Sequence, residues 1–150
     1  MKTPIKRKTI FAGLTVNIET EKGDVRTGTD ERGEPWAHTY QYPYGEIAGT
    51  VGEDGDPVDV YLGPDETASF VYVAKQMHFD GSYDEDKVFL GFRNYEEAQR
   101  AYFDHGPEWG LMSFTGYTLE AFGRTYLEPR RATNLIAADR QSAGRRRYGQ

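Results

Sequence analysis

Short runs in which apolar and polar residues alternate predict a chain that is built mainly of β-strands. Residues 9–19 are rich in β-branched and apolar side chains and predict a first strand, and a turn at residues 21–24 separates it from an extended run at residues 25–28. Another turn over residues 30–35 precedes an aromatic-rich segment at residues 36–44. The first third of the chain is therefore predicted to consist of extended segments joined by short turns.

The strongest strand signal lies further along the chain. Val58, Val60 and Leu62 recur at every second position, which is the period of a strand with one buried face. The intervening Asp59 is therefore expected to point away from the packed face.

Two longer apolar runs follow and predict a hairpin. Residues 69–75 and residues 87–92 are rich in β-branched and aromatic side chains, and a turn at residues 80–82 lies between them. The connection is unusually acidic, because four carboxylates fall between residues 80 and 86.

Two helices are predicted in the last third of the chain. Asn94 can cap the first helix, and Glu97 stands at the third position as in a capping box. The apolar stripe of this helix consists of Tyr95, Ala98, Ala101 and Tyr102. Residues 109–117 are predicted to form a loop, and a shorter helix is expected to begin after Thr118 and to end before Pro129. This order of elements predicts a small α+β domain around a partly closed antiparallel sheet, with two C-terminal helices.

The composition is that of a single domain without disulfides. The chain has 150 residues, which is typical of one domain, and it has no cysteine, which fits a reducing cytoplasm. Its low mean hydropathy and the lack of a long apolar run argue against a membrane-spanning segment.

The net charge of −6 conceals an uneven distribution. Residues 1–8 carry four basic side chains, and residues 130–150 carry six arginines and one aspartate, so the stretch between them is near −15. We interpret residues 1–129 as the domain, with a basic arm at residues 1–8, and residues 130–150 as a basic tail. These ends could contact nucleic acid or an acidic partner, although a charged tail is more often simply solvated. The acidic middle would repel a free anionic substrate unless metal ions accompany it.

The candidate chemistry lies in the turn before the strand that contains Asp59. Asp54 and Asp56 flank Gly55, so residues that favour a turn bring these two carboxylates toward Asp59. Three anions at short range repel one another unless protons or metal ions neutralise them, and Mg²⁺ is the usual partner of a site made of carboxylates. A solvated hairpin turn is the alternative interpretation of this segment alone.

The aspartate turn resembles the signature of a known family. Residues 54–60 read Asp-Gly-Asp-Pro-Val-Asp-Val, which is similar to the signature of the soluble, Mg²⁺-dependent inorganic pyrophosphatases of family I. Residues 42–47 read Tyr-Pro-Tyr-Gly-Glu-Ile and resemble a Tyr-Gly segment that the family places upstream at a similar spacing. The chain looks most like the compact pyrophosphatase-like domains of bacteriophages and mobile elements. The resemblance covers residues 14–92 best and implies an OB-like, partly closed antiparallel β-barrel of five strands.

The resemblance also implies roles for individual residues. The implied metal ligands are Asp54, Asp59, Asp80, Glu85 and Glu19. Asp56 is implied to accept a proton from the attacking water, and the implied phosphate binders are Arg26, Lys87 and Tyr44. The second ligand of the acidic turn falls on Glu85 or on Asp84, and the sequence leaves this choice open. The implied cofactors are two or more Mg²⁺ ions, which Mn²⁺ could replace.

Two functions follow as expectations. The first is the hydrolysis of pyrophosphate to two phosphates in the cytoplasm, which would be that of a bacterial host if the chain is phage-encoded. The second is a virion or replication-complex protein that keeps this fold and acts through binding. The aspartates and Lys87 favour the enzyme. The binding role is favoured by the basic ends and by the lack of an arginine that the family places before the Tyr-Gly segment, where His38 is the nearest polar residue. A homo-oligomer is left open.

Overall fold

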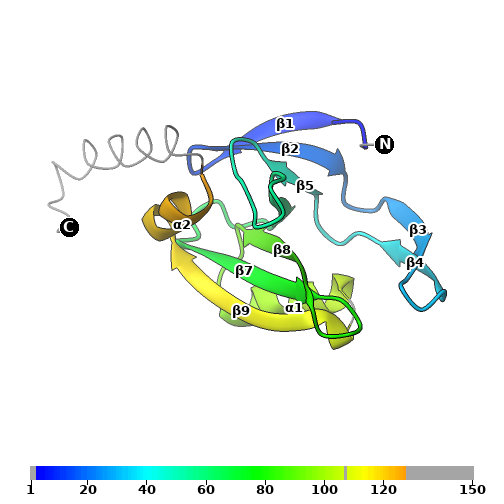
Figure 1. Ribbon diagram of the computed structural model, residues 1–150. Helices are drawn as coiled ribbons and strands as arrows, with labels where there is room; N and C mark the ends of the chain where they lie inside the picture. Colours follow the sequence, from blue (N-terminus) through cyan, green and yellow to red (C-terminus); the bar gives the residue numbers. More distant parts are fainter. Residues whose placement is uncertain (1–2, 107, 128–150) are drawn as a thin grey trace, which may run out of the picture.

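The computed structural model describes residues 3–106 and 108–127 (Figure 1). The strands in this part of the chain are β1 (Arg7–Phe11), β2 (Leu14–Thr20), β3 (Val25–Thr29), β4 (Pro35–Thr39), β5 (Tyr44–Ile47), β6 (Asp59–Leu62), β7 (Phe70–Met77), β8 (Tyr83–Leu90) and β9 (Leu111–Thr118). The helices are α1 (Tyr95–His105), the short 3-10 turn η1 (Glu108–Gly110) and α2 (Leu119–Tyr126). The predicted basic tail at residues 130–150 lies outside the described residues, and the predicted arm at residues 1–8 overlaps the start of β1.

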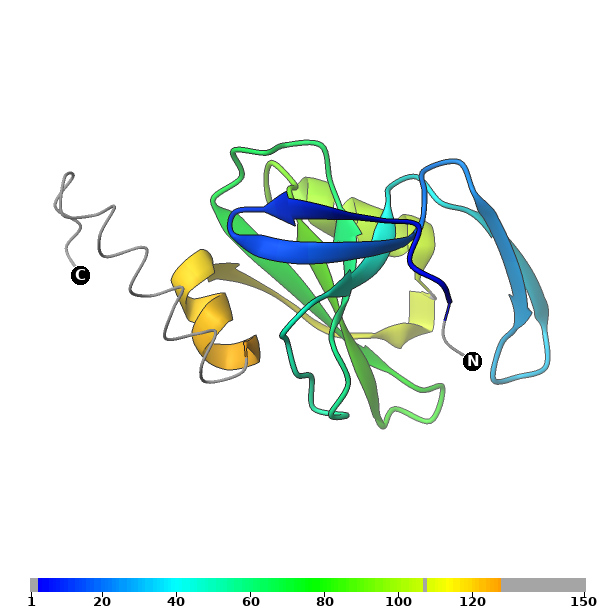
Figure 2. The ribbon, with the colours of Figure 1, turned by 90° about the horizontal axis from the view of Figure 1, so that it is seen from above.

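Seven strands form one sheet in the order β1-β2-β5-β6-β8-β7-β9, and β3 and β4 form a separate two-stranded sheet. All pairs in the large sheet are antiparallel except β6 and β8, which run parallel. Figures 1 and 2 show the β3–β4 hairpin standing beside the large sheet rather than continuing it.

The expected five-stranded antiparallel barrel therefore needs correction. Among the described residues the pairing runs from an edge at β1 to an edge at β9, so its hydrogen bonds do not close the sheet into a barrel. The parallel β6–β8 pair arises because β7 leaves β6 by a long connection and then pairs with the far side of β8. The coarser prediction of an α+β domain, mostly β with two α-helices, is confirmed.

Two local predictions were wrong. Residues 9–19 are not one strand, because Ala12 and Gly13 both have positive φ, 51° and 83°, and form the tight turn of the β1–β2 hairpin. Residues 109–117 are not a loop, because β9 pairs with β7 along its length. β9 is half exposed at the edge of the sheet, so its alternation of apolar and polar residues is weak in the sequence.

The large sheet is buried on both faces, and the two faces differ in composition. One face is mainly aliphatic, with Val60 and Val88 among its buried residues, and packs against Phe122 of α2. The other face is aromatic and packs against α1, with Tyr61 and Phe89 among its buried residues. The prediction that β6 has one buried face was therefore wrong. Both of its faces are buried, and the alternation separates an aliphatic core from an aromatic core rather than core from solvent.

Both predicted helices are present with their predicted caps. The side chain of Asn94 accepts a hydrogen bond from the backbone nitrogen of Glu97, and the side chain of Thr118 accepts one from Ala121. In the part of the chain that the structure describes, neither helix is long and apolar enough to cross a membrane.

Candidate functional site

The candidate site begins with a row of side chains across three adjacent strands. In the register of the sheet, Glu46 of β5 stands opposite Asp59 of β6, and Asp59 stands opposite Lys87 of β8. Residues that face each other in paired strands point to the same side of the sheet, and here that is the aromatic face. The pairing therefore brings together residues that are 41 positions apart in the sequence.

Lys87 is the centre of this row. Its ammonium nitrogen lies 2.8 Å from Asp59 Oδ2, 2.7 Å from Glu85 Oε1 and 2.6 Å from the hydroxyl oxygen of Tyr44. Three acceptors match the three donors of an ammonium group, so its hydrogen bonds are satisfied although the side chain is only 15% exposed. Burial lowers the pKa of Lys87, but the acidic groups of Tyr44, Asp59 and Glu85 outweigh burial and hold that pKa well above its ordinary value.

The carboxylates of Asp59 and Glu85 both contact this ammonium group and influence each other's pKa. Burial acts to raise the pKa of Asp59, but Lys87 outweighs it and the net pKa is lowered. Burial raises the pKa of Glu85, the neighbouring Asp59 acts in the same direction, and Lys87 offsets only part of the rise. The single positive charge of Lys87 neutralises only one of two partly buried carboxylates. The remaining negative charge favours the binding of either a proton or a further cation between Asp59 and Glu85.

Tyr44, Asp59 and Glu85 border a cleft of about 590 Å³, here called the acidic cleft. Its polar lining consists of Thr3, Glu19, Arg26, Tyr44, Glu46, Asp54, Asp56, Asp59, Glu85 and Asp86. Arg26 is the only basic residue among the described lining residues, and its guanidinium donates to the neutral hydroxyls of Thr20 and Thr3 at 3.2 and 3.3 Å. The described lining of the cleft therefore combines seven carboxylates with one arginine, which donates to the uncharged hydroxyls of Thr20 and Thr3.

The turn that carries Asp54 and Asp56 has a defined local structure. Asp54 Oδ1 accepts a hydrogen bond from the backbone nitrogen of Asp56 at 3.0 Å, and Gly55 takes φ +86°, which L-residues with a side chain rarely adopt. At the base of the loop, Thr50 Oγ1 accepts from the backbone nitrogen of Val58 at 3.0 Å and donates to Ile47 at 2.6 Å. This buried anchor fixes the point from which the exposed aspartates reach the cleft.

Asp86 is a residue of the cleft wall that the sequence interpretation did not select. Its side chain is fully buried and accepts hydrogen bonds from the hydroxyls of Tyr83 and Tyr126, both at 2.9 Å, and from the ammonium of Lys75 at 3.3 Å. Tyr126 lies in α2, so the interaction ties this helix to β8 behind the cleft. The sequence signal for a buried Asp86 is its spacing from Val88. The two residues lie two positions apart in β8, so they share one buried face of the strand.

Glu46 was also missed. It lies two positions after Tyr44 in β5 and opposite Asp59, so a strand pattern extended from Tyr44 would have placed it on the same face.

The structure brings eight of the nine predicted site residues to the acidic cleft or to the Lys87 cluster beside it. The exception is Asp80, which is exposed in the β7–β8 turn, where its carboxylate accepts from the backbone nitrogen and the hydroxyl of Ser82 at 2.9 and 2.6 Å. Asp80 does not line the cleft, and its role as a ligand stays a prediction. Of the two alternatives in the acidic turn, Glu85 lines the cleft and Asp84 does not.

The donor set of the cleft fits a hard divalent cation. Carboxylate oxygens dominate the wall, and neither histidine nor cysteine is among its described lining residues. Mg²⁺ and Mn²⁺ prefer such oxygen ligands, whereas softer metals prefer nitrogen and sulfur. The exposure of Asp54 and Asp56 leaves room for the water molecules that Mg²⁺ usually retains.

The chain is similar to two solved structures and to one family model. The chain is similar to an inorganic phosphatase from Anaplasma phagocytophilum, with 19% identity over 81% of this chain and 88% of the other and a TM-score of 0.37. It is also similar to an inorganic pyrophosphatase from Coxiella burnetii, with 16% identity over 83% and 90% of the two chains and a TM-score of 0.29. No curated protein matches the chain. The family model described as inorganic pyrophosphatase matches residues 3–126, and the chain therefore belongs to the inorganic pyrophosphatase family.

Proposed function

We propose that this protein hydrolyses inorganic pyrophosphate to two phosphates with the help of Mg²⁺ held in the acidic cleft. The observation that carries the proposal is the convergence of Asp54, Asp56, Asp59 and Glu85 on one cleft, beside Lys87, in a chain of this family. Pyrophosphate is a strongly charged anion, so an acidic cleft suits it only together with cations.

The metal ligands in this proposal are Asp54, Asp59, Glu85 and Glu19, all of which line the cleft. Bound there, two or more Mg²⁺ ions would neutralise the phosphate oxygens and lower the pKa of a water molecule. Mn²⁺ has similar ligand preferences and is expected to substitute for Mg²⁺.

Asp56 is the proposed proton acceptor. The water oxygen forms a bond to one phosphorus, the bond between that phosphorus and the bridging oxygen breaks, and a proton of the water passes to the Asp56 carboxylate. Asp56 is suited to this role because its side chain is exposed at the cleft and its position is fixed through the Asp54 hydrogen bond. The second phosphate leaves with the bridging oxygen.

Arg26 is the residue best placed to contact a phosphate. Its guanidinium lines the cleft, and among the described residues its hydrogen bonds go to two hydroxyl groups, so its charge is available to an incoming anion. Lys87, in contrast, has all its donors engaged by Asp59, Glu85 and Tyr44. In the proposed mechanism Lys87 and Tyr44 therefore hold the two carboxylates in position, and they reach a phosphate only by exchanging one of these partners.

The first experiment is to measure phosphate release from pyrophosphate with and without Mg²⁺. We expect Mg²⁺-dependent turnover by the wild type and a loss of about 10² to 10⁴-fold in Asp56→Asn, the range typical of a general base. Lys87→Ala is expected to lower turnover as well, whereas Asp65→Asn is a matched control because Asp65 bonds Thr67 in an exposed turn away from the cleft. Folded protein that releases no phosphate with Mg²⁺ or Mn²⁺ would refute the proposal.

The remaining expectations stay predictions. A bacteriophage origin, a cytoplasmic location, a homo-oligomer and a binding role in a virion or replication complex are not tested by the described residues. Contact with nucleic acid was expected through the basic ends, and residues 130–150 lie outside the described part of the chain.

A further inference from the structure

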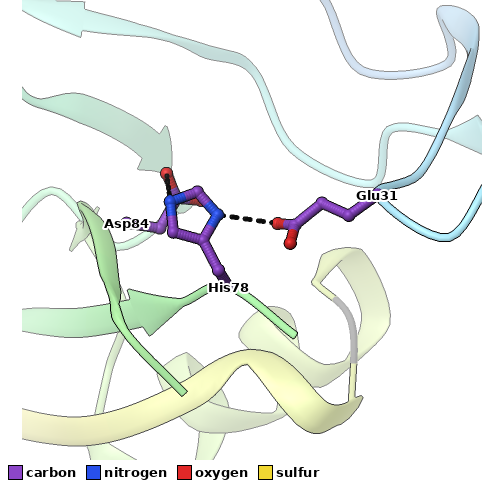
Figure 3. Close-up of side chains that lie close together, drawn as sticks. All are labelled: Glu31, His78 and Asp84. Carbon is purple, nitrogen blue, oxygen red and sulfur yellow. Dashed lines mark hydrogen bonds and ion pairs between the residues drawn. The ribbon is translucent and has the colours of Figure 1, made fainter. Parts of the chain in front are cut away.

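A second group of metal-binding side chains lies away from the acidic cleft. Glu31 comes from the turn between β3 and β4, His78 follows the end of β7, and Asp84 lies in β8 (Figure 3). His78 Nδ1 lies 2.8 Å from Glu31 Oε2, and His78 Nε2 lies 3.6 Å from Asp84 Oδ1. One ligand atom from each residue can be chosen so that all three lie within 4.8 Å of one another. None of the three lines the acidic cleft.

The group exists because the tips of two hairpins meet. Glu31 Oε1 also accepts a hydrogen bond from the backbone nitrogen of Phe79 at 3.1 Å, and the guanidinium of Arg32 lies 5.2 Å from the centre of the Phe79 ring and 5.9 Å from that of Trp109. These contacts join the β3–β4 hairpin, which is not part of the large sheet, to the β7–β8 turn and to Trp109 of η1. The tip contacts therefore add to those that β4 makes through the His38 ring, which packs on His105 of α1, and to those that β3 makes through Arg26.

The local charge favours a cation. The two carboxylates of Glu31 and Asp84 face a single imidazole, and Asp80 in the β7–β8 turn adds a third negative charge close enough to interact with both Glu31 and His78. The three side chains are 42%, 42% and 27% exposed, so an ion can enter from solvent and water can complete its coordination.

We propose that Glu31, His78 and Asp84 form a second divalent-cation site, one that prefers Zn²⁺ over Mg²⁺. One imidazole nitrogen and two carboxylates are ligands that suit Zn²⁺, and three protein ligands with water at the remaining position is a common arrangement for it. Zinc lies about 2 Å from its ligands, so ligand atoms around it are roughly 3 to 4 Å apart. Glu31 and Asp84 lie at opposite nitrogens of the His78 ring, so the ring and one of the two carboxylates must rotate for all three residues to reach one ion.

An ion at this position would hold the β3–β4 hairpin against the β7–β8 turn. The hairpin borders a second cleft of about 710 Å³, whose lining includes Trp36, Tyr40, Tyr61 and Trp109 together with Glu31 and Asp84. Bound Zn²⁺ therefore fixes one wall of this aromatic cleft. This inference does not rest on the proposed pyrophosphatase activity, because the acidic cleft shares none of the three ligands.

The test is a titration of the full chain with Zn²⁺ in the presence of excess Mg²⁺. Calorimetry measures the binding, and thermal unfolding measures the change in melting temperature. Excess Mg²⁺ reduces Zn²⁺ binding at oxygen-only sites, and the difference between wild type and His78→Gln reports the binding that uses a nitrogen ligand. We expect the wild type to bind one Zn²⁺ with a rise in melting temperature, and His78→Gln and Glu31→Gln each to weaken this binding at least about tenfold.

Two control variants are matched to these changes. Glu34→Gln removes an exposed carboxylate from the same β3–β4 turn, and His38→Gln removes another of the three histidines of the chain, so both should bind Zn²⁺ as the wild type does. Equal Zn²⁺ binding in His78→Gln and wild type would overturn the proposal, as would loss in the controls or the absence of Zn²⁺ binding. Circular dichroism establishes that each variant is folded.

Discussion

The ammonium nitrogen of Lys87 lies 2.8 Å from Asp59 Oδ2, across the one parallel strand pair of the described sheet. The two residues are direct partners in the register of β6 and β8, so their side chains emerge side by side on the same face. Glu85 reaches the same nitrogen at 2.7 Å. The lysine is therefore both a structural link between two strands and the neutralising charge for two carboxylates of the acidic cleft.

Replacing Lys87 by methionine is expected to make stability depend on Mg²⁺. The substitution keeps most of the apolar stem but leaves Asp59 and Glu85 without their cation, which we expect to cost about 2 kcal/mol in the absence of metal, because both carboxylates remain partly exposed. Mg²⁺ should restore more stability to Lys87→Met than to the wild type. Urea unfolding with EDTA and with Mg²⁺ measures both effects, and an equal response of the two proteins to Mg²⁺ would contradict the prediction.

Gly45 is expected to tolerate no side chain. A Cβ atom at this position would lie 1.8 Å from the backbone oxygen of Asn17 in the neighbouring strand β2, and backbone cannot rotate away as a side chain can. Gly45→Ala should destabilise the protein by about 3 kcal/mol and displace the adjacent Tyr44 and Glu46 of the cleft. Gly116→Ala is the matched control, because a Cβ there meets only the Tyr72 ring at 3.2 Å. Thermal unfolding compares the variants, and similar losses in both would show that the β2–β5 spacing can adjust.

Tyr126 is expected to stabilise the wall of the cleft through its hydroxyl group. Tyr126→Phe removes one of the three donors to the buried carboxylate of Asp86, which we expect to cost about 1.5 kcal/mol, because the lost bond is to a charged acceptor. The hydroxyl of Tyr95 makes a longer contact, 3.4 Å from Gln99 Nε2, on an exposed helix surface. Tyr95→Phe should therefore change the free energy of unfolding little, and a loss as large as that of Tyr126→Phe would argue against the buried network.

His105 is expected to make the fold less stable as the pH falls below about 6.5. Its Nε2 accepts a hydrogen bond from the backbone nitrogen of Gln41 at 3.0 Å, and its Nδ1 lies 2.7 Å from the carbonyl oxygen of Ala101. Burial lowers the pKa of His105, so the folded state prefers the neutral ring. The stability that this provides is complete above the unfolded pKa of about 6.5 and is lost as the pH falls toward the lowered pKa of the folded state.

The measurement is the free energy of unfolding of wild type and His105→Gln at several pH values between 7.5 and 5. The other two histidines contribute with opposite signs, because burial lowers the pKa of His38 while the hydrogen bond to Glu31 raises that of His78. The His78 effect is common to the two proteins and cancels in the difference, whereas the His38 ring lies 4.6 Å from that of His105 and helps to lower the pKa of His105, so it acts in the same direction. The wild type should lose more stability than His105→Gln over this range, and parallel curves would contradict the assignment.

Much of the local structure could be predicted from the sequence. The caps at Asn94 and Thr118 depend on residues three positions apart, and the aspartate turn at residues 54–59 depends on a single glycine and proline. These features are short-range, so the residue types themselves carry the information. The same holds for the choice of carboxylates at residues 54, 56 and 59, which the structure gathers at one cleft.

The pairing of strands that lie far apart in the sequence could not be predicted from such short-range signals. The edge strand β9 alternates too weakly to be recognised, and it forms because β7 supplies its hydrogen bonds. Asp80 has the residue type and spacing of a ligand, but the turn that it shares with Ser82 sets it beside the Glu31 and His78 pair rather than at the acidic cleft.

The sequence by itself determined local features, namely the turn of aspartates at residues 54–59 and the two capped helices. The tertiary structure alone decided that Asp59 faces Lys87, that Glu46 joins them and that Asp86 is buried behind them. The physical reason is that strand register and burial are set by the packing of both faces of the sheet, to which residues from the whole chain contribute.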